Sequence, residues 1–363
     1  MNSSEPSTFL LPWKPLGNPP LYNLTARAPL FPWISDFHLS LLLPVSAYWV
    51  LSATYHIISA FDFFSQYRLH SPAEFKIRNR PTVAEVLRSV ILQQIIQTGW
   101  GLVLGHTVLG TQEMVGTEDY DIAMWAIWTQ RLACGLRLIL EGVGMIMGVN
   151  VNEWKYGFHS SFITYQLVIT FFSLAFSSDE SQDKHLAEWE MLAGRAMYFV
   201  VIPAFRFAIA IFLSDTWQYF WHRAMHSNRW LFRNMHAPHH RIYVPYAFGA
   251  FYNTLWEAFV LDTLGTTLSL YVAGLSTRQA TLFGTLSVLK GVDDHCGYKL
   301  PWDPLQWLGE QTVEFHDVTN YSQLYLTFWD HVCGTVCRKS EAEKQLLYQR
   351  GQIEADKKDR GGM

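Results

Sequence analysis

Residues 37–61 read FHLSLLLPVSAYWVLSATYHIISAF, a run of 25 residues without Asp, Glu, Lys or Arg between Asp36 and Asp62. A helix of about 20 apolar residues is long enough to cross the roughly 30 Å hydrocarbon core of a bilayer. Two more uncharged runs of that length follow at residues 89–112 and 156–178. The three runs predict three membrane-spanning helices.

Two weaker candidate spans, residues 129–150 and 196–214, are interrupted by charged side chains. The loop at residues 62–88 has five Lys or Arg residues against three acids. Because cytoplasmic loops carry such an excess, we expect this loop in the cytosol. Five crossings then place the chain from Asp215 onward in the cytosol, whereas four would place it in the lumen.

The composition supports a folded membrane protein. Of the 363 residues, 50% are hydrophobic and only 16% are charged, whereas about a quarter of the residues are charged in a typical soluble domain. The net charge is −4 and no basic stripe is present, so nothing indicates a nucleic-acid partner. We expect an all-α fold, a polytopic membrane helix bundle with a cytosolic helical cap.

A segment of 19 residues contains five of the 14 histidines. His222 and His226 have the i, i+4 spacing that puts two side chains on one helical face. His236, His239 and His240 have the spacing i, i+3, i+4. A single buried histidine is more often part of a hydrogen-bonded core, but five imidazoles exceed what one tetrahedral zinc uses. The pattern predicts a di-metal site, for which Zn, Fe, Cu and Ni all accept imidazole.

Four acids are candidates for orienting these histidines: Asp215, Asp293, Asp294 and Asp317. A ligand histidine usually passes its other ring N–H to a carboxylate or a carbonyl. Asp215 lies about two helical turns before His222, but it fits a helix cap equally well. Asp293 and Asp294 either orient His295 or belong to a turn.

Two further acids, Glu257 and Asp262, interrupt an apolar region at residues 250–275. An acid at membrane depth is a functional candidate, here as a partner for a lipid amine. The alternative is an acid at the water interface or one paired with Arg241. The sequence does not assign substrate-binding residues.

Longer motifs around the histidines resemble the fatty acid hydroxylase superfamily. The matching stretches are His222–His226, His236–His240, Tyr243–Gly249, Val292–Tyr298, Pro301–Pro304 and Phe328–Asp330. Of these, Tyr243–Gly249 and Asp293–Pro304 are most similar to the fungal sphinganine C4-hydroxylase branch, and less so to the sterol oxidases. The resemblance covers about residues 36–337, which gives four regions: a Pro-rich tail (1–36), a transmembrane helical region (37–214), the histidine-box domain (215–337) and a charged tail (338–363).

The resemblance implies a multi-pass enzyme of the endoplasmic reticulum with a cytosolic active site. It implies two iron ions held by histidines, O₂ as oxidant, and electrons from NADPH through cytochrome b5. The carrier and its reductase would be separate proteins, because the His-Pro-Gly-Gly element of cytochrome b5 is absent from the chain. The substrate implied is a membrane lipid, sphinganine or a ceramide, and the product of sphinganine is phytosphingosine.

The family's third histidine motif, HxxHH, is incomplete in this chain. Phe315-His316-Asp317 runs directly into Val318, so the resemblance suggests a deletion of about nine residues. The candidate metal ligands are therefore His222, His226, His236, His239, His240, His295 and His316. Two alternatives to a working C4-hydroxylase are a catalytically impaired homologue and a related oxidase of sterols or fatty lipids.

Overall fold

The computed structural model describes residues 21–146, 188–307, 321 and 325–336. These residues are mostly helical, as predicted, and two short strands, β1 (Thr25–Ala26) and β2 (Met114–Val115), pair antiparallel. The α-helices are α1 (Asp36–Ala60), α2 (Pro72–Arg78), α3 (Val83–Leu104), α4 (Glu118–Ile146), α6 (Glu188–Ala196), α7 (Ile202–Ser227), α8 (Arg229–Leu231), α9 (Leu255–Glu257), α10 (Gly265–Ala273), α11 (Thr277–Asp294), α12 (Pro304–Trp307) and α13 (Phe328–Cys333).

Shorter 3₁₀ and π segments connect or extend these helices. They are η1 (Ser65–Tyr67), η2 (Gly105–Leu109), η4 (Met197–Val201), η5 (Phe232–His236), η6 (His239–Arg241), η7 (Ala247–Phe251) and η8 (Ala258–Leu264). Of these, η2, η4, η5 and η8 are π-helical. π-Helical turns are rare and often occur at functional sites, and η5 ends at one of the predicted metal ligands.

Polar caps begin several of the helices. The Ser35 side chain accepts a hydrogen bond from the His38 backbone at the start of α1, and Thr82 does the same for Glu85 in α3. A reciprocal capping box between Ser276 and Gln279 opens α11. Such caps satisfy backbone N–H groups that the first turn of a helix leaves unpaired.

The chain divides into two compact units, residues 1–27 with 114–204 and residues 28–113 with 205–363. In the first unit α4 packs against α6. A Cβ atom at Gly194 would lie 2.5 Å from the Ile122 carbonyl oxygen, so only glycine allows this close approach of the two helices.

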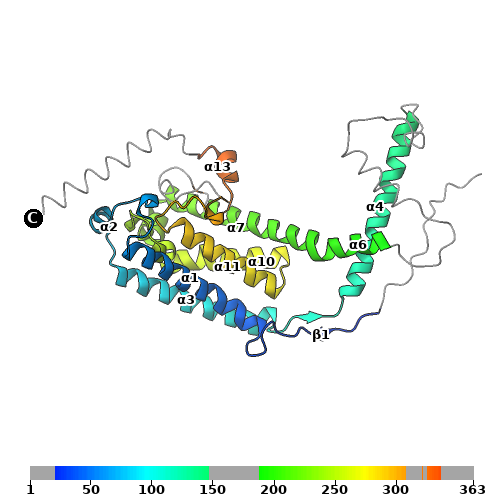
Figure 1. The fold of residues 1–363 in the computed structure, drawn as a ribbon, viewed down its shortest axis with the longest axis horizontal. Coiled ribbons are helices and arrows are strands. Elements are labelled where there is room, and N and C mark those ends of the chain that lie inside the picture. The colour runs from blue at the N-terminus through cyan, green and yellow to red at the C-terminus, as the bar shows by residue number, and fades with distance from the viewer. Residues whose placement is uncertain (1–20, 147–187, 308–320, 322–324, 337–363) are drawn as a thin grey trace, which may run out of the picture. The chain divides into compact units, whose positions relative to one another are not determined.

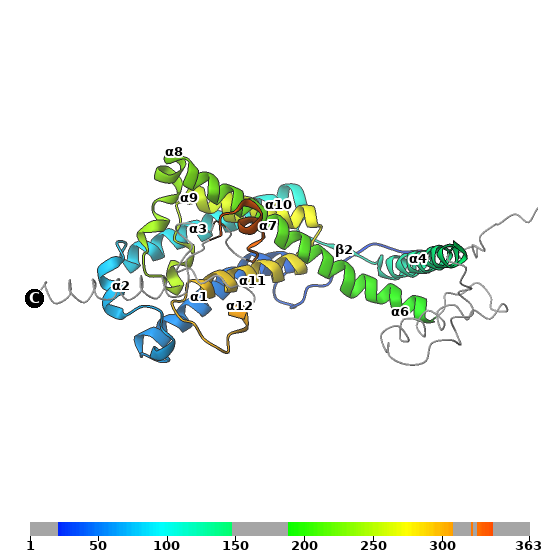
Figure 2. The same ribbon diagram turned by 90° about the horizontal axis from the view of Figure 1, so that it is seen from above.

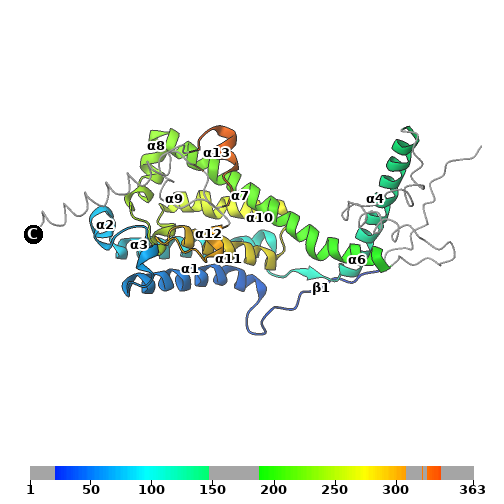
Figure 3. The ribbon, with the colours of Figure 1, turned by 45° about the horizontal axis from the view of Figure 1, so that its top comes forward.

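The second unit contains α1, α3, α10 and α11, which lie side by side (Figure 1). Its largest core cluster joins Tyr48 and Tyr55 of α1, Val86 and Val90 of α3, and Val292 of α11. Figure 2 shows α7 running alongside α10 and α11, and a second cluster of Ala210, Ala273 and Phe283 joins these three helices. Figure 3 shows α8, α9 and α13 grouped near the end of α7.

Within the described part of the chain, two helical segments are long and apolar enough to cross a membrane, Asp36–Ala60 and Glu188–Ser227. Only 17% and 6% of their most apolar windows are buried in the protein, so most of this apolar surface is not covered by other described residues. They cover residues 37–60 of the predicted span at 37–61 and the whole of that at 196–214, whereas the described parts of the predicted spans at 89–112 and 129–150 do not meet the same criterion. The predicted span at 156–178 lies outside the described residues, and the count of five crossings stays a prediction.

Two glycine-to-alanine changes are expected to have opposite effects on stability. A Cβ at Gly265 of α10 would lie 2.3 Å from Cδ1 of Trp217, whose ring is fixed because its Nε1–H donates to the Val260 carbonyl. We expect Gly265→Ala to destabilise the protein by about 1–3 kcal/mol. Gly99→Ala in α3 meets no atom within 4 Å and should stabilise its helix by up to about 1 kcal/mol.

The measurement is the thermal unfolding midpoint of both variants in the same detergent. A Gly265→Ala variant as stable as the unchanged protein would contradict the close packing of α7 and α10.

Candidate metal centre

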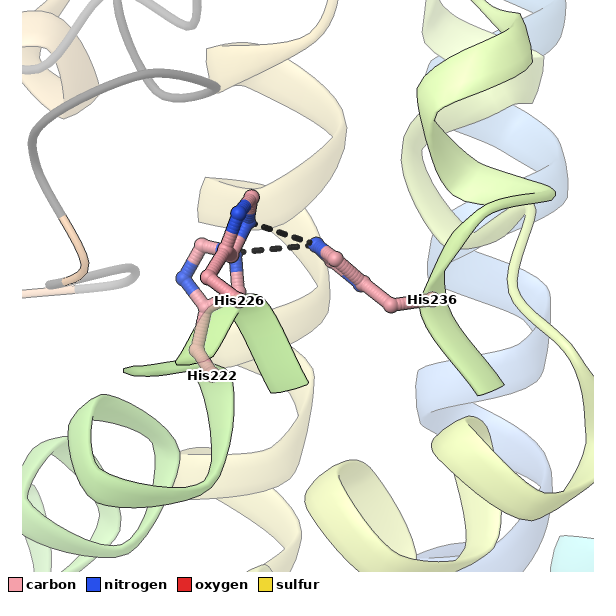
Figure 4. Close-up of side chains that lie close together, drawn as sticks. All are labelled: His222, His226 and His236. Carbon is pink, nitrogen blue, oxygen red and sulfur yellow. Dashed lines mark hydrogen bonds between the residues drawn. The ribbon is translucent and has the colours of Figure 1, made fainter. Parts of the chain in front are cut away.

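Three histidines from two segments meet at one point. His222 and His226 lie on the last turns of α7, one turn apart, and His236 is the last residue of the π-helical segment η5. The three Nε2 atoms are mutually 3.1 Å apart (Figure 4). His222 and His236 are completely buried, so their rings are not exposed to solvent.

The partners of the other ring nitrogens fix which nitrogen has the proton. His222 Nδ1 lies 3.1 Å from the Tyr321 carbonyl oxygen, and His236 Nδ1 lies 2.6 Å from a carboxylate oxygen of Glu257. Both partners are acceptors, so in the neutral rings each Nδ1 has the proton and each Nε2 has a lone pair. Lone pairs that face each other at this distance repel, and a bound cation would turn that repulsion into attraction.

The spacing of the nitrogens fits a metal ion. Imidazole nitrogen binds zinc at about 2.0–2.1 Å, so two such ligands lie about 3.0 Å apart at a right angle and about 3.4 Å apart at the tetrahedral angle. The three Nε2 atoms, 3.1 Å apart, fall within this range. His222, His226 and His236 can therefore hold one ion of a transition metal.

The other predicted ligands among the described residues, His239, His240 and His295, lie around this trio. The His240 ring lies 4.4 Å from that of His236 and 5.0 Å from that of His226, measured between centroids. His239 stacks on His236 at 5.5 Å, and His295 lies 6.2 Å from His239. Six of the seven predicted ligands are thus brought together, while His316 lies outside the described residues.

Backbone carbonyls orient the outer histidines as well. His239 Nδ1 lies 3.3 Å from the Tyr252 carbonyl oxygen, and His295 Nδ1 lies 2.8 Å from that of Gly291. This arrangement leaves their Nε2 atoms as acceptors. The exposed His331 makes the same contact with Thr327, so this contact alone does not identify a ligand, and the convergence of several rings is the informative feature.

Glu257 is the acid that contacts a candidate ligand directly. The residue is 2% exposed and follows the N-cap Thr254 of α9. Burial raises the pKa of its carboxyl to about 7, against the lowering effect of nearby His239 and His240. A carboxylate on the far ring nitrogen fixes the ring and increases its basicity toward a metal. The sequence indicated Glu257 only as an acid in an apolar run, and its proposed partner Arg241 instead pairs with Glu85.

Two buried carboxylates hold the chain segment that contacts His222. Asp330 Oδ1 accepts the backbone N–H of Tyr321 at 2.9 Å, and Asp215 accepts the backbone N–H groups of Tyr325 and Leu326. The Tyr321 carbonyl then receives the His222 ring N–H. Asp215 thus shares a helix with His222, as predicted, but its printed contacts are with the backbone of residues 325 and 326.

The remaining predicted acids contact other groups. Asp293 accepts the Tyr55 hydroxyl at 2.6 Å, and Asp294 pairs with the buried Lys290 one helical turn earlier. Burial raises the pKa of Asp293 to about 6 and that of Asp294 to about 7. Both acids lie at the end of α11 just before His295, where they tie this end of the helix to α1 and to its own previous turn. Asp317 lies outside the described residues.

Comparison with known proteins identifies the family. The family model described as fatty acid hydroxylase matches residues 207–335. Sphingolipid C4-hydroxylase SUR2 of Saccharomyces cerevisiae is 35% identical over 87% of this chain and 76% of its own length. The sphingolipid C4-hydroxylase sur2 of Schizosaccharomyces pombe is 34% identical over 82% of this chain and 87% of its own.

The chain belongs to the fatty acid hydroxylase family. The family and the hydroxylase class predicted from the histidine motifs are confirmed. A rice relative named very-long-chain aldehyde decarbonylase GL1-9, from Oryza sativa subsp. indica, is 30% identical over 84% of this chain and 92% of its own. No solved structure gives a significant match.

Glu257→Gln tests the role of the buried carboxylate. The amide keeps the size of the side chain but removes the negative charge from the His236 ring, so we expect metal affinity to fall about 10- to 100-fold. The measurement is metal content by mass spectrometry after dialysis against graded chelator. The control is Glu188→Gln, an exposed acid in the first turn of α6, and equal metal retention in both variants would exclude the role.

Asp330 variants test whether the backbone contact to His222 depends on this carboxylate. Asp330→Ala removes the acceptor of the Tyr321 N–H, which costs about 1–3 kcal/mol for a buried donor, whereas Asp330→Asn keeps an acceptor oxygen. We expect faster amide hydrogen exchange in residues 321–336 and lower metal content for the alanine variant only. Unchanged exchange and metal content in Asp330→Ala would show that residue 321 is held by other contacts.

Proposed function

We propose that this protein is a sphinganine C4-hydroxylase that converts a long-chain base to phytosphingosine. The overall reaction inserts one oxygen atom of O₂ into the C4–H bond, and two electrons and two protons reduce the other atom to water. The observation that supports it is the convergence of three imidazole nitrogens, two of them from fully buried rings whose Nδ1 atoms face the Tyr321 carbonyl and Glu257. Relatives named sphingolipid C4-hydroxylase, similar over most of the chain, support the choice of substrate.

The metal we propose is a pair of iron ions held by the seven histidines predicted above. Bound iron would supply the activation of O₂ that an unreactive C–H bond requires. His222, His226 and His236 would hold one ion, and His239, His240 and His295 are the described candidates for the second, with His316 as a further candidate from outside the described residues. Glu257 would fix the His236 ring, and Asp330 would keep the Tyr321 carbonyl against His222.

The membrane location, topology and electron donors that we propose are based on the apolar helices and on the family. The chain would be a polytopic protein of the endoplasmic reticulum membrane, with residues 215–337 forming a cytosolic cap on the bundle. Electrons would come from NADPH through separate cytochrome b5 and reductase proteins. Apolar helices with little buried surface support membrane insertion, since lipid contact favours apolar side chains.

The second candidate is a homologue with the same fold and little or no hydroxylase activity. The shortened motif after His316 favours it, because an imidazole replaced by water loses affinity and orientation. The two candidates differ in the number of metal ions that the protein holds and in whether phytosphingosine is formed. Both candidates keep the histidine trio, which is assembled entirely from residues 222–236.

The test is expression in a fungal strain whose own C4-hydroxylase gene is deleted, with long-chain bases measured by mass spectrometry. We expect phytosphingosine in cells that express the unchanged protein, and a loss of at least about 100-fold for His236→Ala. His331→Ala, an exposed histidine on α13, is the matched control and should keep the activity. Accumulated sphinganine without phytosphingosine, at normal protein levels, would favour the inactive homologue.

A further inference from the structure

A cavity of about 220 Å³ lies apart from the converging histidines. Its walls are the last turns of α1, the segment from Arg68 to Lys76 that includes α2, the start of α3, and the segments Val244–Phe248 and Cys296–Tyr298. All of these parts belong to the second compact unit. Neither the metal ligands nor the acids that orient them line this space.

The ionisable side chains in the lining are mostly basic, and one of them, His70, pairs with the buried Glu74 just outside it. His56, Arg68, His70 and Lys76 line it, and no Asp or Glu does. Arg68 is held in place because it donates to the Tyr298 hydroxyl and the Ser59 carbonyl and pairs with Asp62 on the surface. The pattern favours a ligand with negative charge.

Two donors in the lining have no partner within the described part of the chain. Lys76 is exposed and makes no ion pair or hydrogen bond there, and the hydroxyl of Tyr246 is buried without a hydrogen-bond partner. An unsatisfied buried hydroxyl costs free energy, which a ligand oxygen would recover. A ligand that supplies several acceptor oxygens and a negative charge suits both groups, and a phosphate supplies both.

The other walls are apolar, and the rim has membrane-facing features. Phe75, Val83 and Phe248 line the cavity, so its occupant also has an apolar part. Four aromatic residues near the end of α1, a candidate span, are exposed. Phe61, Phe63 and Phe64 directly follow α1, and Trp302 packs against Phe64. Aromatic side chains gather where a span meets the water interface.

The backbone supports this arrangement of the rim. Asp62 and Phe64 have φ angles of 57° and 54°, in the left-handed region that non-glycine residues rarely adopt. This local conformation turns the chain after α1, and Phe63 and Phe64 in the turn are 54% and 43% exposed. Exposed rings held by a strained turn indicate a surface with a function.

We propose that this cavity binds the phosphate group of an anionic membrane phospholipid, with Lys76, Arg68 and Tyr246 around the phosphate and the apolar walls around the adjoining carbon chain. The loop at residues 62–88 is predicted to be cytosolic, and anionic lipids are concentrated in the cytoplasmic leaflet. A sphingoid base, whose head is a cation, does not match this lining. The site is therefore not the one for the cationic head of a sphingoid base. It rests on the proposed cytosolic side of this loop, but not on the proposed hydroxylase activity.

The experiment titrates the full-length protein in detergent with dioctanoyl phosphatidic acid and with dioctanoyl phosphatidylcholine, which differ in net charge. We expect tighter binding of phosphatidic acid. Lys76→Glu should weaken it at least about 10-fold, since each basic residue near an anionic lipid contributes about 1 kcal/mol. Val83→Trp should also weaken it, because it fills the cavity without changing a charge.

The control is Lys299→Glu, the same charge change at an exposed residue that does not line the cavity. Equal affinity of the unchanged protein, Lys76→Glu and Val83→Trp would overturn the proposal, as would equal affinity for the two lipids. Inorganic phosphate is the second probe. If millimolar phosphate displaces the lipid from the unchanged protein but not from Lys76→Glu, the site is assigned to phosphate itself. If phosphate displaces no lipid, the site is assigned to the lipid. Each variant's thermal midpoint confirms that it is folded.

Discussion

The arrangement on which the rest of this structure depends is the convergence of three imidazole Nε2 atoms at 3.1 Å from one another. Helix α7 brings two of the rings together without any tertiary contact, because their i, i+4 spacing places them on one face of the helix. The third ring has to be brought from a separate segment and held there. The buried carboxylate of Glu257 does this from one side of His236, and the Tyr321 carbonyl fixes His222 from another.

Buried acids in this unit therefore serve to place other groups. A carboxylate removed from water is costly unless hydrogen bonds or opposite charges compensate it. Asp215 and Asp330, each at most 2% exposed, are compensated by backbone N–H groups of the segment that follows the shortened third motif. That segment also contacts His222 through the Tyr321 carbonyl. The same backbone groups that stabilise Asp215 and Asp330 therefore help to position this ligand.

The sequence predicted the parts of this arrangement that depend on local spacing. An uncharged run gave α1, and the i, i+4 histidines gave one face of α7. It did not predict that Glu257 faces His236, because the two are 21 residues apart and meet only through a π-helical segment and a turn. The same holds for Asp215, whose partners at 325 and 326 are more than a hundred residues away. Contacts of that range depend on the packing of helices, which spacing alone does not show.

The position of the histidines along the chain bears on the incomplete third motif. All three converging nitrogens come from residues 222–236, and the region after His316 contributes the Tyr321 carbonyl that orients His222. His239 and His295 lie further out, with rings 6.2 Å apart, and a second ion there would depend more on additional ligands. We infer that the shortened motif affects the second position, while the first is fixed by α7, η5 and Glu257. Because C–H hydroxylation in the proposed function uses two ions, the second position is the one that decides between an active enzyme and a metal-binding homologue.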